Sequence, residues 1–179
     1  MSEGLYAIVG VLIGGVLGWA GEYIRYRYTT RQRATYAAIR SVIALDRYVS
    51  KCALSLTESD PDYPDDQDPD DNWNLPEKVV IPEDVDWSSL SSDLAYRILV
   101  IPQRDAEARE GVNFTYGVAG GAAAKQILDE YFEEIGLDAA KCAVKLRKNF
   151  RLREHRYDKW NPVEVIRAYR KKRLDRAAS

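Results

Sequence analysis

Histidine and cysteine are scarce in this sequence, which has one His and two Cys among 179 residues. A Cys/His zinc site or a Ser-His-Asp triad would have to be built around His155, which lies in a highly charged stretch typical of a hydrated surface. Cys52 and Cys142 are far apart in the chain and belong to no Cys-x-x-Cys motif. We therefore expect two reduced thiols, each buried on the apolar face of a helix, and no disulfide.

Motifs for cofactor binding are also missing. The segment GVAGG at residues 117–121 lacks the G-x-x-x-x-G-K-[ST] form and a preceding apolar strand, so it predicts a turn between helices. An enzymatic or ligand-sensing alternative would depend on Arg97, Arg104 and an acidic cluster, for which we expect a solvated helix face. The cluster consists of Asp129, Glu130, Glu133 and Glu134. The sequence predicts no catalytic residue, no resident metal and no cofactor.

The composition excludes three further classes. Hydrophobic residues make up 46% of the chain and charged residues 30%, which fits neither a collagen, nor a disulfide scaffold, nor a wholly disordered protein. These averages conceal strong segregation of charge. The net charge is +6 over residues 25–57, -12 over 58–93, -3 over 94–144 and +9 over 145–179. The acidic block can neutralise basic faces of the same molecule, or it can leave them free for an anionic membrane leaflet.

An uncharged run from Gly4 to Gly21 is the most informative segment. As a helix it would be about 27 Å long, close to the thickness of a bilayer core. Aromatic residues lie at both ends, four arginines follow within residues 25–33, and no basic residue precedes the run. This pattern predicts a transmembrane helix at 4–24, uncleaved, in the inner membrane, with the N-terminus outside and residues 25–179 in the cytoplasm. The alternative is a helix buried in the core of a soluble domain.

Three glycines recur at a spacing of four within this run: Gly10, Gly14 and Gly18. They would lie on one stripe of the helix, where two backbones can approach closely, which predicts self-association of the anchor. The alternative is that glycine is simply common in transmembrane helices.

The next segment, residues 25–57, predicts a juxtamembrane helix. Apolar residues recur there at intervals of three and four, namely Ile39, Val42, Ile43, Leu45, Val49, Cys52, Ala53 and Leu56. Neither Pro nor Gly separates this stretch from the anchor, so we expect one helix from about residue 5 to residue 56. Its apolar stripe would face a helical partner.

Residues 58–86 predict an exposed acidic linker, because the four prolines within residues 58–77 forbid a regular helix and like charges repel. Within it, five oxygen ligands fall at the spacing of an EF-hand-like calcium loop: Asp66, Asp68, Asp70, Asn74 and Glu77. The sixth position is Asp71 where the sharp turn needs glycine. A solvated linker is therefore the favoured interpretation, with calcium binding as the alternative.

Residues 87–152 predict a helical domain. Apolar residues from Trp87 to Ile101 have helical spacing behind a possible N-cap at Asp86, and Pro102 is expected to stop or kink that helix. Glycines between residues 111 and 121 predict a break. Gly136 is expected to end the next helix, so that residues 137–150 form the second arm of an antiparallel pair.

Residues 153–179 predict a basic tail with a final helix. Asn161 offers an N-cap, Pro162 a first helical residue and Glu164 an N3 carboxylate. The basic residues considered for binding to an anionic surface are Arg167, Arg170, Lys171, Lys172 and Arg173. A solvated face, an anionic membrane surface and a nucleic acid are the three interpretations, with nucleic acid the least favoured.

Short motifs in residues 80–152 add a resemblance. Asp86-Trp87, Tyr96-Arg97-Ile98-Leu99 and Gly136-Leu137-Asp138-Ala139-Ala140 resemble those of an uncharacterised family of bacterial membrane-anchored helical proteins. The resemblance implies a membrane-anchored helical protein but no site residues. Together the patterns predict a mainly α fold, with one transmembrane helix continuing into a cytoplasmic helical bundle. Its predicted function is that of a non-catalytic interaction or scaffolding module, with the lipid bilayer, a second copy and an unidentified protein as partners.

Overall fold

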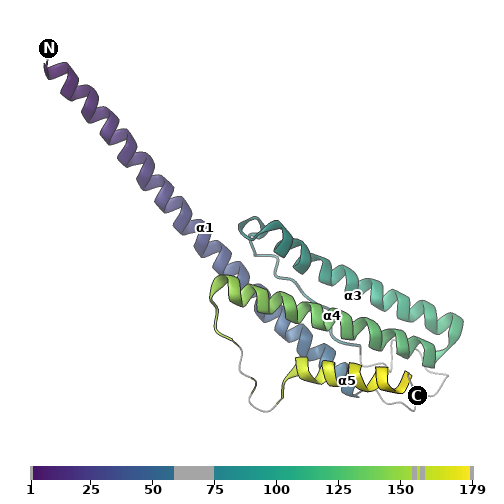
Figure 1. Cartoon of the computed structure of the whole chain (residues 1–179). Helices are drawn as coiled ribbons and strands as arrows, with labels where there is room; N and C mark the ends of the chain where they lie inside the picture. The colour runs from purple at the N-terminus through teal and green to yellow at the C-terminus, as the bar shows by residue number, and fades with distance from the viewer. Residues whose placement is uncertain (1, 59–74, 155–156, 158–159, 178–179) are drawn as a thin grey trace.

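The computed structural model describes residues 2–58, 75–154, 157 and 160–177; the side chains of residues 1–14, 16 and 177 lie outside this description. Four α-helices account for most of it: α1 (Ser2–Glu58), α3 (Ser92–Ala119), α4 (Gly121–Phe150) and α5 (Pro162–Ala177). A short 3-10 turn, η1 (Trp87–Ser89), precedes α3 (Figure 1). No strand occurs within the described ranges, so the predicted mainly α class is confirmed.

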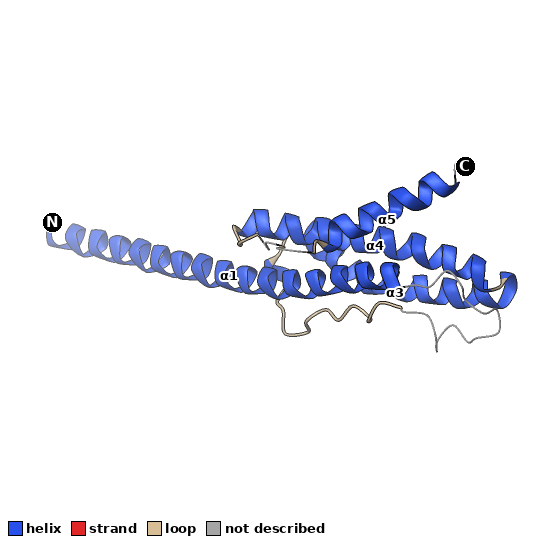
Figure 2. Ribbon diagram, turned by 90° about the horizontal axis from the view of Figure 1, so that it is seen from below, coloured by secondary structure: helices blue, strands red, loops and turns tan. Residues whose placement is uncertain are grey.

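Helix α1 is unbroken over 57 residues, which makes it about 85 Å long at 1.5 Å per residue. Its C-terminal half packs in the bundle, whereas its N-terminal half projects from it (Figures 1 and 2). The predicted continuity of the first helix with the juxtamembrane helix is therefore confirmed.

The C-terminal half of α1 buries the apolar stripe that the sequence predicts. Leu45, Val49, Cys52 and Leu56 are almost fully buried, and Ala37 and Ala38 allow close helix packing. Two members of the predicted set, Ile39 and Ile43, are exposed because they lie beyond the edge of the buried stripe. Both cysteines are free and buried, as predicted.

Helices α3 and α4 form an antiparallel pair, and α4 lies between α3 and α1 (Figure 1). Most of the largest fully buried side chains come from these two helices and α1, among them Phe132, Ile135 and Leu146 of α4 and Ile98 and Ile101 of α3. Complete burial of one such side chain stabilises the fold by about 1.5–3 kcal/mol. This core, and not helix propensity alone, holds the bundle together.

The prediction that Gly136 ends a helix is wrong. Gly136 lies in the middle of α4, where a Cβ atom would be 3.1 Å from Cδ1 of Ile166 and 3.2 Å from Cβ of Cys52. Glycine is present because α1 and α5 approach α4 closely at this point. The predicted antiparallel pair around residue 136 is replaced by one helix of 30 residues.

The helix does not stop at Pro102, which was one of the two outcomes expected for this proline. Helix α3 continues through Pro102 and Gly111 to Ala119. The break lies at Gly120, whose φ of +81° is a conformation that glycine adopts without strain. The predicted turn within residues 117–121 is thus confirmed in part. At the other end, the helix expected from Trp87 begins only at Ser92, after η1.

Residues 75–86 run alongside α1 and place acidic groups against its basic side chains. Arg47 donates to Glu77 at 2.9 Å, and Arg40 lies 3.3 Å from Asp84. Tyr36 donates its hydroxyl proton to Asp84 at 2.8 Å, which together with Arg40 lowers the pKa of that carboxyl. The described part of the acidic block therefore neutralises a basic face of the same molecule.

Candidate functional site

Metal binding has no support among the described side chains, where no group of three or more His, Cys, Asp or Glu residues could hold an ion. Of the calcium candidates, Asp66, Asp68, Asp70 and Asn74 lie outside the described residues. Glu77 is described, and its carboxylate pairs with Arg47 at 2.9 Å and with Lys51 at 3.7 Å. His155 also lies outside the described residues.

The projecting half of α1 exposes large apolar side chains. Leu17, Trp19, Ile24 and Tyr26 are each 67–70% exposed. At 100° per residue, positions 17 and 24 lie on one side of the helix and positions 19 and 26 on the opposite side. A surface helix of a globular protein has one apolar stripe that it buries, whereas the apolar side chains here lie on two opposite sides of the helix.

Aromatic and basic side chains between Trp19 and Tyr28 overlap these positions and form a collar. Trp19 stacks on Tyr23 with ring centroids 5.7 Å apart, and the Arg27 guanidinium lies 5.7 Å from the centroid of the Tyr23 ring. Tyr26 and Tyr28 are exposed beside them. Rings with an apolar body and a polar tip, followed by arginines, are typical of the boundary between a membrane and water.

Three glycines were predicted to bring two helices together. The surroundings of Gly18 are described, whereas those of Gly10 and Gly14 lie outside the description. A Cβ atom added at Gly18 would meet nothing within 4 Å. Association through this stripe therefore stays a prediction.

Helix α5 starts as the sequence predicts. The side-chain Oδ1 of Asn161 accepts a hydrogen bond from the backbone N–H of Val163 at 3.1 Å, which is an N-cap interaction. Four residues into the helix, Ile166 is fully buried against Gly136. Val163, Val165 and Tyr169 also pack against the core, so the cap and these apolar contacts help to set the position of α5 on the bundle.

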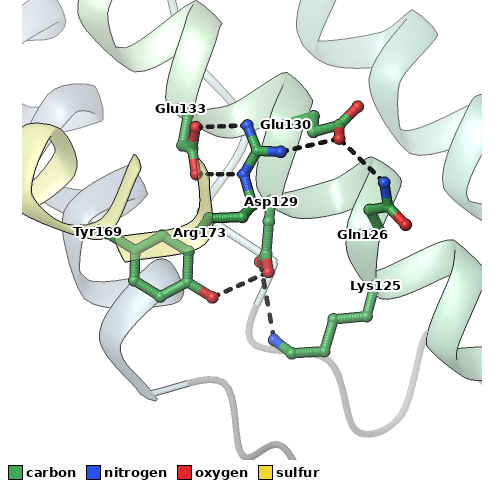
Figure 3. A network of polar contacts seen from close by, with 7 residues as sticks. All are labelled: Lys125, Gln126, Asp129, Glu130, Glu133, Tyr169 and Arg173. Atoms are coloured by element: carbon green, nitrogen blue, oxygen red, sulfur yellow. Dashed lines mark hydrogen bonds and ion pairs between the residues drawn. The ribbon is translucent and has the colours of Figure 1, made fainter. Parts of the chain in front are cut away.

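Arg173, one of the five predicted surface-binding residues, points inward and not to solvent (Figure 3). Its guanidinium donates to both carboxylate oxygens of Glu133, at 2.9 and 3.0 Å, and to Glu130 at 2.8 Å. Glu133 is only 1% exposed. The bidentate ion pair with Arg173 offsets the desolvation cost of burying the Glu133 carboxylate. The same pair holds α5 against α4.

The same network contains a second buried carboxylate, Asp129 (Figure 3). It accepts a hydrogen bond from the Tyr169 hydroxyl at 2.8 Å, and Lys125 Nζ lies 3.7 Å away. Burial raises the pKa of Asp129 and outweighs the opposing effects of Lys125 and Tyr169. The expectation of a solvated acidic face is therefore wrong for Asp129 and Glu133, because α5 covers them.

The other four predicted surface-binding residues remain on the outer face of α5. Arg167, Arg170, Lys171 and Lys172 are all exposed. They are available to an anionic partner, and binding through them stays a prediction.

The two arginines considered for an enzymatic site take part in separate pairs. Arg97 pairs with Asp93 at 3.1 Å, whereas Arg104 pairs with Glu134 at 2.8 Å and Asp138 at 2.7 Å. The acidic cluster is thus joined to Arg104 but not to Arg97.

One buried polar cluster was not predicted. Asp105 of α3 is 3% exposed, accepts a hydrogen bond from Tyr48 of α1 at 2.8 Å and pairs with Arg109 at 3.0 Å. Arg109 also donates to the backbone carbonyl of Pro76. Nearby, burial raises the pKa of Cys52 to about 12, so this thiol stays protonated and unreactive. The i,i+4 spacing of Asp105 and Arg109 was the one available signal.

Among the residues that the structure describes, no helix contains a stretch long and apolar enough to cross a membrane. The greater part of the predicted anchor, residues 4–14, falls outside the described side chains. No family model, curated protein or solved structure matches the chain.

Proposed function

We propose that the chain is a single-pass membrane protein of the inner membrane whose helical bundle works in the cytoplasm as an interaction or scaffolding module. The observation that carries this proposal is the projecting half of α1, with apolar side chains on opposite sides, an aromatic and arginine collar, and direct continuity with the bundle.

The bilayer is the environment that best suits this helix. Each exposed side chain such as Leu17 or Ile24 would gain about 1.5–3 kcal/mol on transfer out of water. The arginines that follow the run orient the bundle toward the cytoplasm.

The surfaces of the bundle favour contact with another protein over catalysis. The buried ionisable residues Asp105, Asp129 and Glu133 each bridge two helices, which is a structural use of their charges. In contrast, Phe114 and Val118 of α3 are 72% and 73% exposed, and their i,i+4 spacing puts them side by side. Such a pair is a natural contact point for a partner.

Binding of anionic lipid through α5 is the second candidate. The exposed residues that would carry it are Arg167, Arg170, Lys171 and Lys172. Helix α5 packs near Cys52 of α1. Cys52 follows Ile24 by 28 residues, which is about 42 Å along the helix axis and several times the Debye length of about 8 Å. The basic residues of α5 can therefore reach the bilayer that holds the anchor only if α1 lies at a low angle to the membrane plane.

Fractionation of the full-length protein tests the anchor. Replacement of both Leu12 and Ile13 by Arg would cost about 5–7 kcal/mol of insertion free energy, so the variant should leave the membrane fraction after alkaline carbonate extraction, whereas the wild type stays. The matched control places two arginines at Val80 and Val118, which are exposed on the bundle, and should leave the wild-type behaviour unchanged.

A topology measurement completes the experiment. Protease added outside spheroplasts should leave a C-terminal tag intact. Wild-type protein recovered in the soluble fraction, or digestion of the tag from outside, would overturn the proposal.

A further inference from the structure

A cavity of about 620 Å³ is lined by residues of α1, α4 and the start of α5, and by described residues between α4 and α5. It takes no part in the proposed anchor or in the α4–α5 network. Its volume is within the range of about 300–1,000 Å³ that is common for small-molecule sites.

The side chains along α4 divide this cavity into two ends. Ala140, Val144 and Lys148 follow one another at intervals of one helical turn on α4, and Arg151 caps the C-terminus of this helix in a left-handed conformation (φ +53°). From Ala140 to Lys148 the helix rises about 12 Å. Val49 of α1 lines the cavity with the first two. One end of the cavity is therefore apolar and the other end is basic.

The charges at the basic end are not all neutralised. Arg147 lies deep in the wall and forms an ion pair with Asp46 of α1, which satisfies both groups. Lys148 and Arg151 form no ion pair with any residue that the structure describes, and Glu154 is the one other carboxylate in the described lining. Among the described lining residues, these two cations against one anion leave a net positive charge at this end.

A third polar residue, Tyr157, also lines the cavity. Burial raises the pKa of its hydroxyl, and Asp46 raises it further, so this group stays protonated. Two cations next to an apolar wall favour a ligand with an anionic oxygen at the end of an apolar body.

We propose that this cavity binds a small amphipathic carboxylate, with its apolar body against Val49, Ala140 and Val144 and its carboxylate at Lys148 and Arg151. The bundle would then respond to a ligand, a property that the anchor and partner surfaces do not require. Binding at this site needs only a folded bundle, so its failure and the failure of the proposed anchor are distinguishable.

The test uses the full chain, in lipid nanodiscs if it partitions with lipid and in buffer if it does not. Equilibrium dialysis measures binding of 4-phenylbutyrate, with empty nanodiscs as the blank, and compares it with 4-phenylbutanol, a neutral compound of nearly the same shape. Saturable binding of the carboxylate, at least fivefold tighter than that of the alcohol, is expected.

Two variants locate the site. Lys148→Glu with Arg151→Gln should weaken carboxylate binding at least tenfold and leave binding of the alcohol unchanged. Val144→Trp should abolish binding of both compounds, because the indole fills the apolar end. Val144 is 63% exposed, so this substitution does not disturb the core, and unfolding midpoints equal to that of the wild type verify this.

The matched control is Lys171→Glu with Lys172→Glu, which reverses charge on α5 outside the cavity. It should leave the affinity for 4-phenylbutyrate unchanged. The proposal is overturned if no saturable binding occurs, if the alcohol binds as tightly as the acid, or if the control weakens binding as much as the Lys148 and Arg151 variant.

Discussion

The two halves of α1 have the same backbone structure and opposite surroundings. In the C-terminal half, apolar residues repeat every three or four positions and form one buried stripe, with Leu45 and Cys52 fully buried. In the projecting half they lie on opposite sides, with Leu17 67% and Trp19 70% exposed. Helix formation is thus common to both halves, whereas the angular distribution of apolar residues decides what each half packs against.

This contrast explains why a single helix can connect two environments. No Gly or Pro interrupts the chain between Glu22 and Glu58, so the backbone hydrogen bonds continue across the boundary. A force or rotation applied to the projecting half is therefore transmitted to the bundle without a hinge. The following predictions test how different the two halves are.

The largest effect is expected from truncation of leucine in the two halves. Leu45→Ala should reduce the free energy of unfolding of the bundle by about 2–5 kcal/mol, because it leaves a cavity in the core. Leu17→Ala should change it by less than about 0.5 kcal/mol, because that side chain makes no core contact. Urea unfolding followed by circular dichroism measures both. Equal losses would mean that the projecting half packs on the bundle.

A second comparison concerns α5, the helix that covers the buried half of α1. Arg173→Ala should cost about 2–3 kcal/mol, since it leaves Glu133 buried without its charged partner. Arg170→Ala, an equal loss of charge on the exposed face, should cost less than about 0.5 kcal/mol.

Adding Glu133→Gln to the Arg173→Ala variant should recover part of the loss, because a neutral amide is less costly to bury than a carboxylate. Unfolding free energies of all four proteins test this. If the Arg170 and Arg173 variants lose equal stability, the network in Figure 3 contributes nothing specific.

Sequence patterns were sufficient where the governing contacts are local. The stripe from Leu45 to Leu56 and the Asn161 cap depend on residues within one or two turns of each other. Both were predicted from spacing alone. The burial of Cys52 and Cys142 followed from the same stripes.

The patterns failed where a distant segment decides the role of a residue. The residues around Gly136 are typical of a helix end, yet this glycine lies within a helix and lets Cys52 and Ile166 approach closely. Both contacts come from distant segments, so the neighbouring sequence does not reveal them. Arg173 and Glu133 are 40 positions apart, so Glu133 was placed on a solvated face and Arg173 was considered for an anionic surface. Pairing across such separations depends on the tertiary fold and was not predictable from charge counts.

A third prediction uses glycine to compare the halves again. Gly136→Val should destabilise the bundle by about 1–3 kcal/mol, because even its Cβ would lie 3.1 Å from Ile166 and 3.2 Å from Cys52. Gly18→Val in the projecting half meets nothing within 4 Å and should leave bundle unfolding unchanged. Thermal and urea unfolding of both variants provide the measurement. A neutral Gly136→Val variant would show that α1, α4 and α5 can separate at no cost.

The smallest effect is a difference in the sign of pH dependence between two aspartates of α4. Burial raises the pKa of Asp129, so just above the unfolded pKa the folded protein retains a proton that the unfolded chain has released. Stability from this group is therefore lost as the pH rises through that window. Burial also acts on Asp138, but hydrogen bonds from Lys141 and Arg104 outweigh it and lower the pKa. Its contribution is present above the unfolded pKa and is lost as the pH falls through the folded value.

Asparagine substitution removes each titration and makes the two signs measurable. The stability of the wild type relative to Asp129→Asn should decrease between pH 3 and pH 7, whereas its stability relative to Asp138→Asn should increase over the same interval. Urea unfolding at four pH values within this interval is sufficient. Two slopes of the same sign would mean that Asp129 is hydrated and that α5 does not cover it. In that case the buried half of α1 would also be more open on its α5 side than the network in Figure 3 indicates.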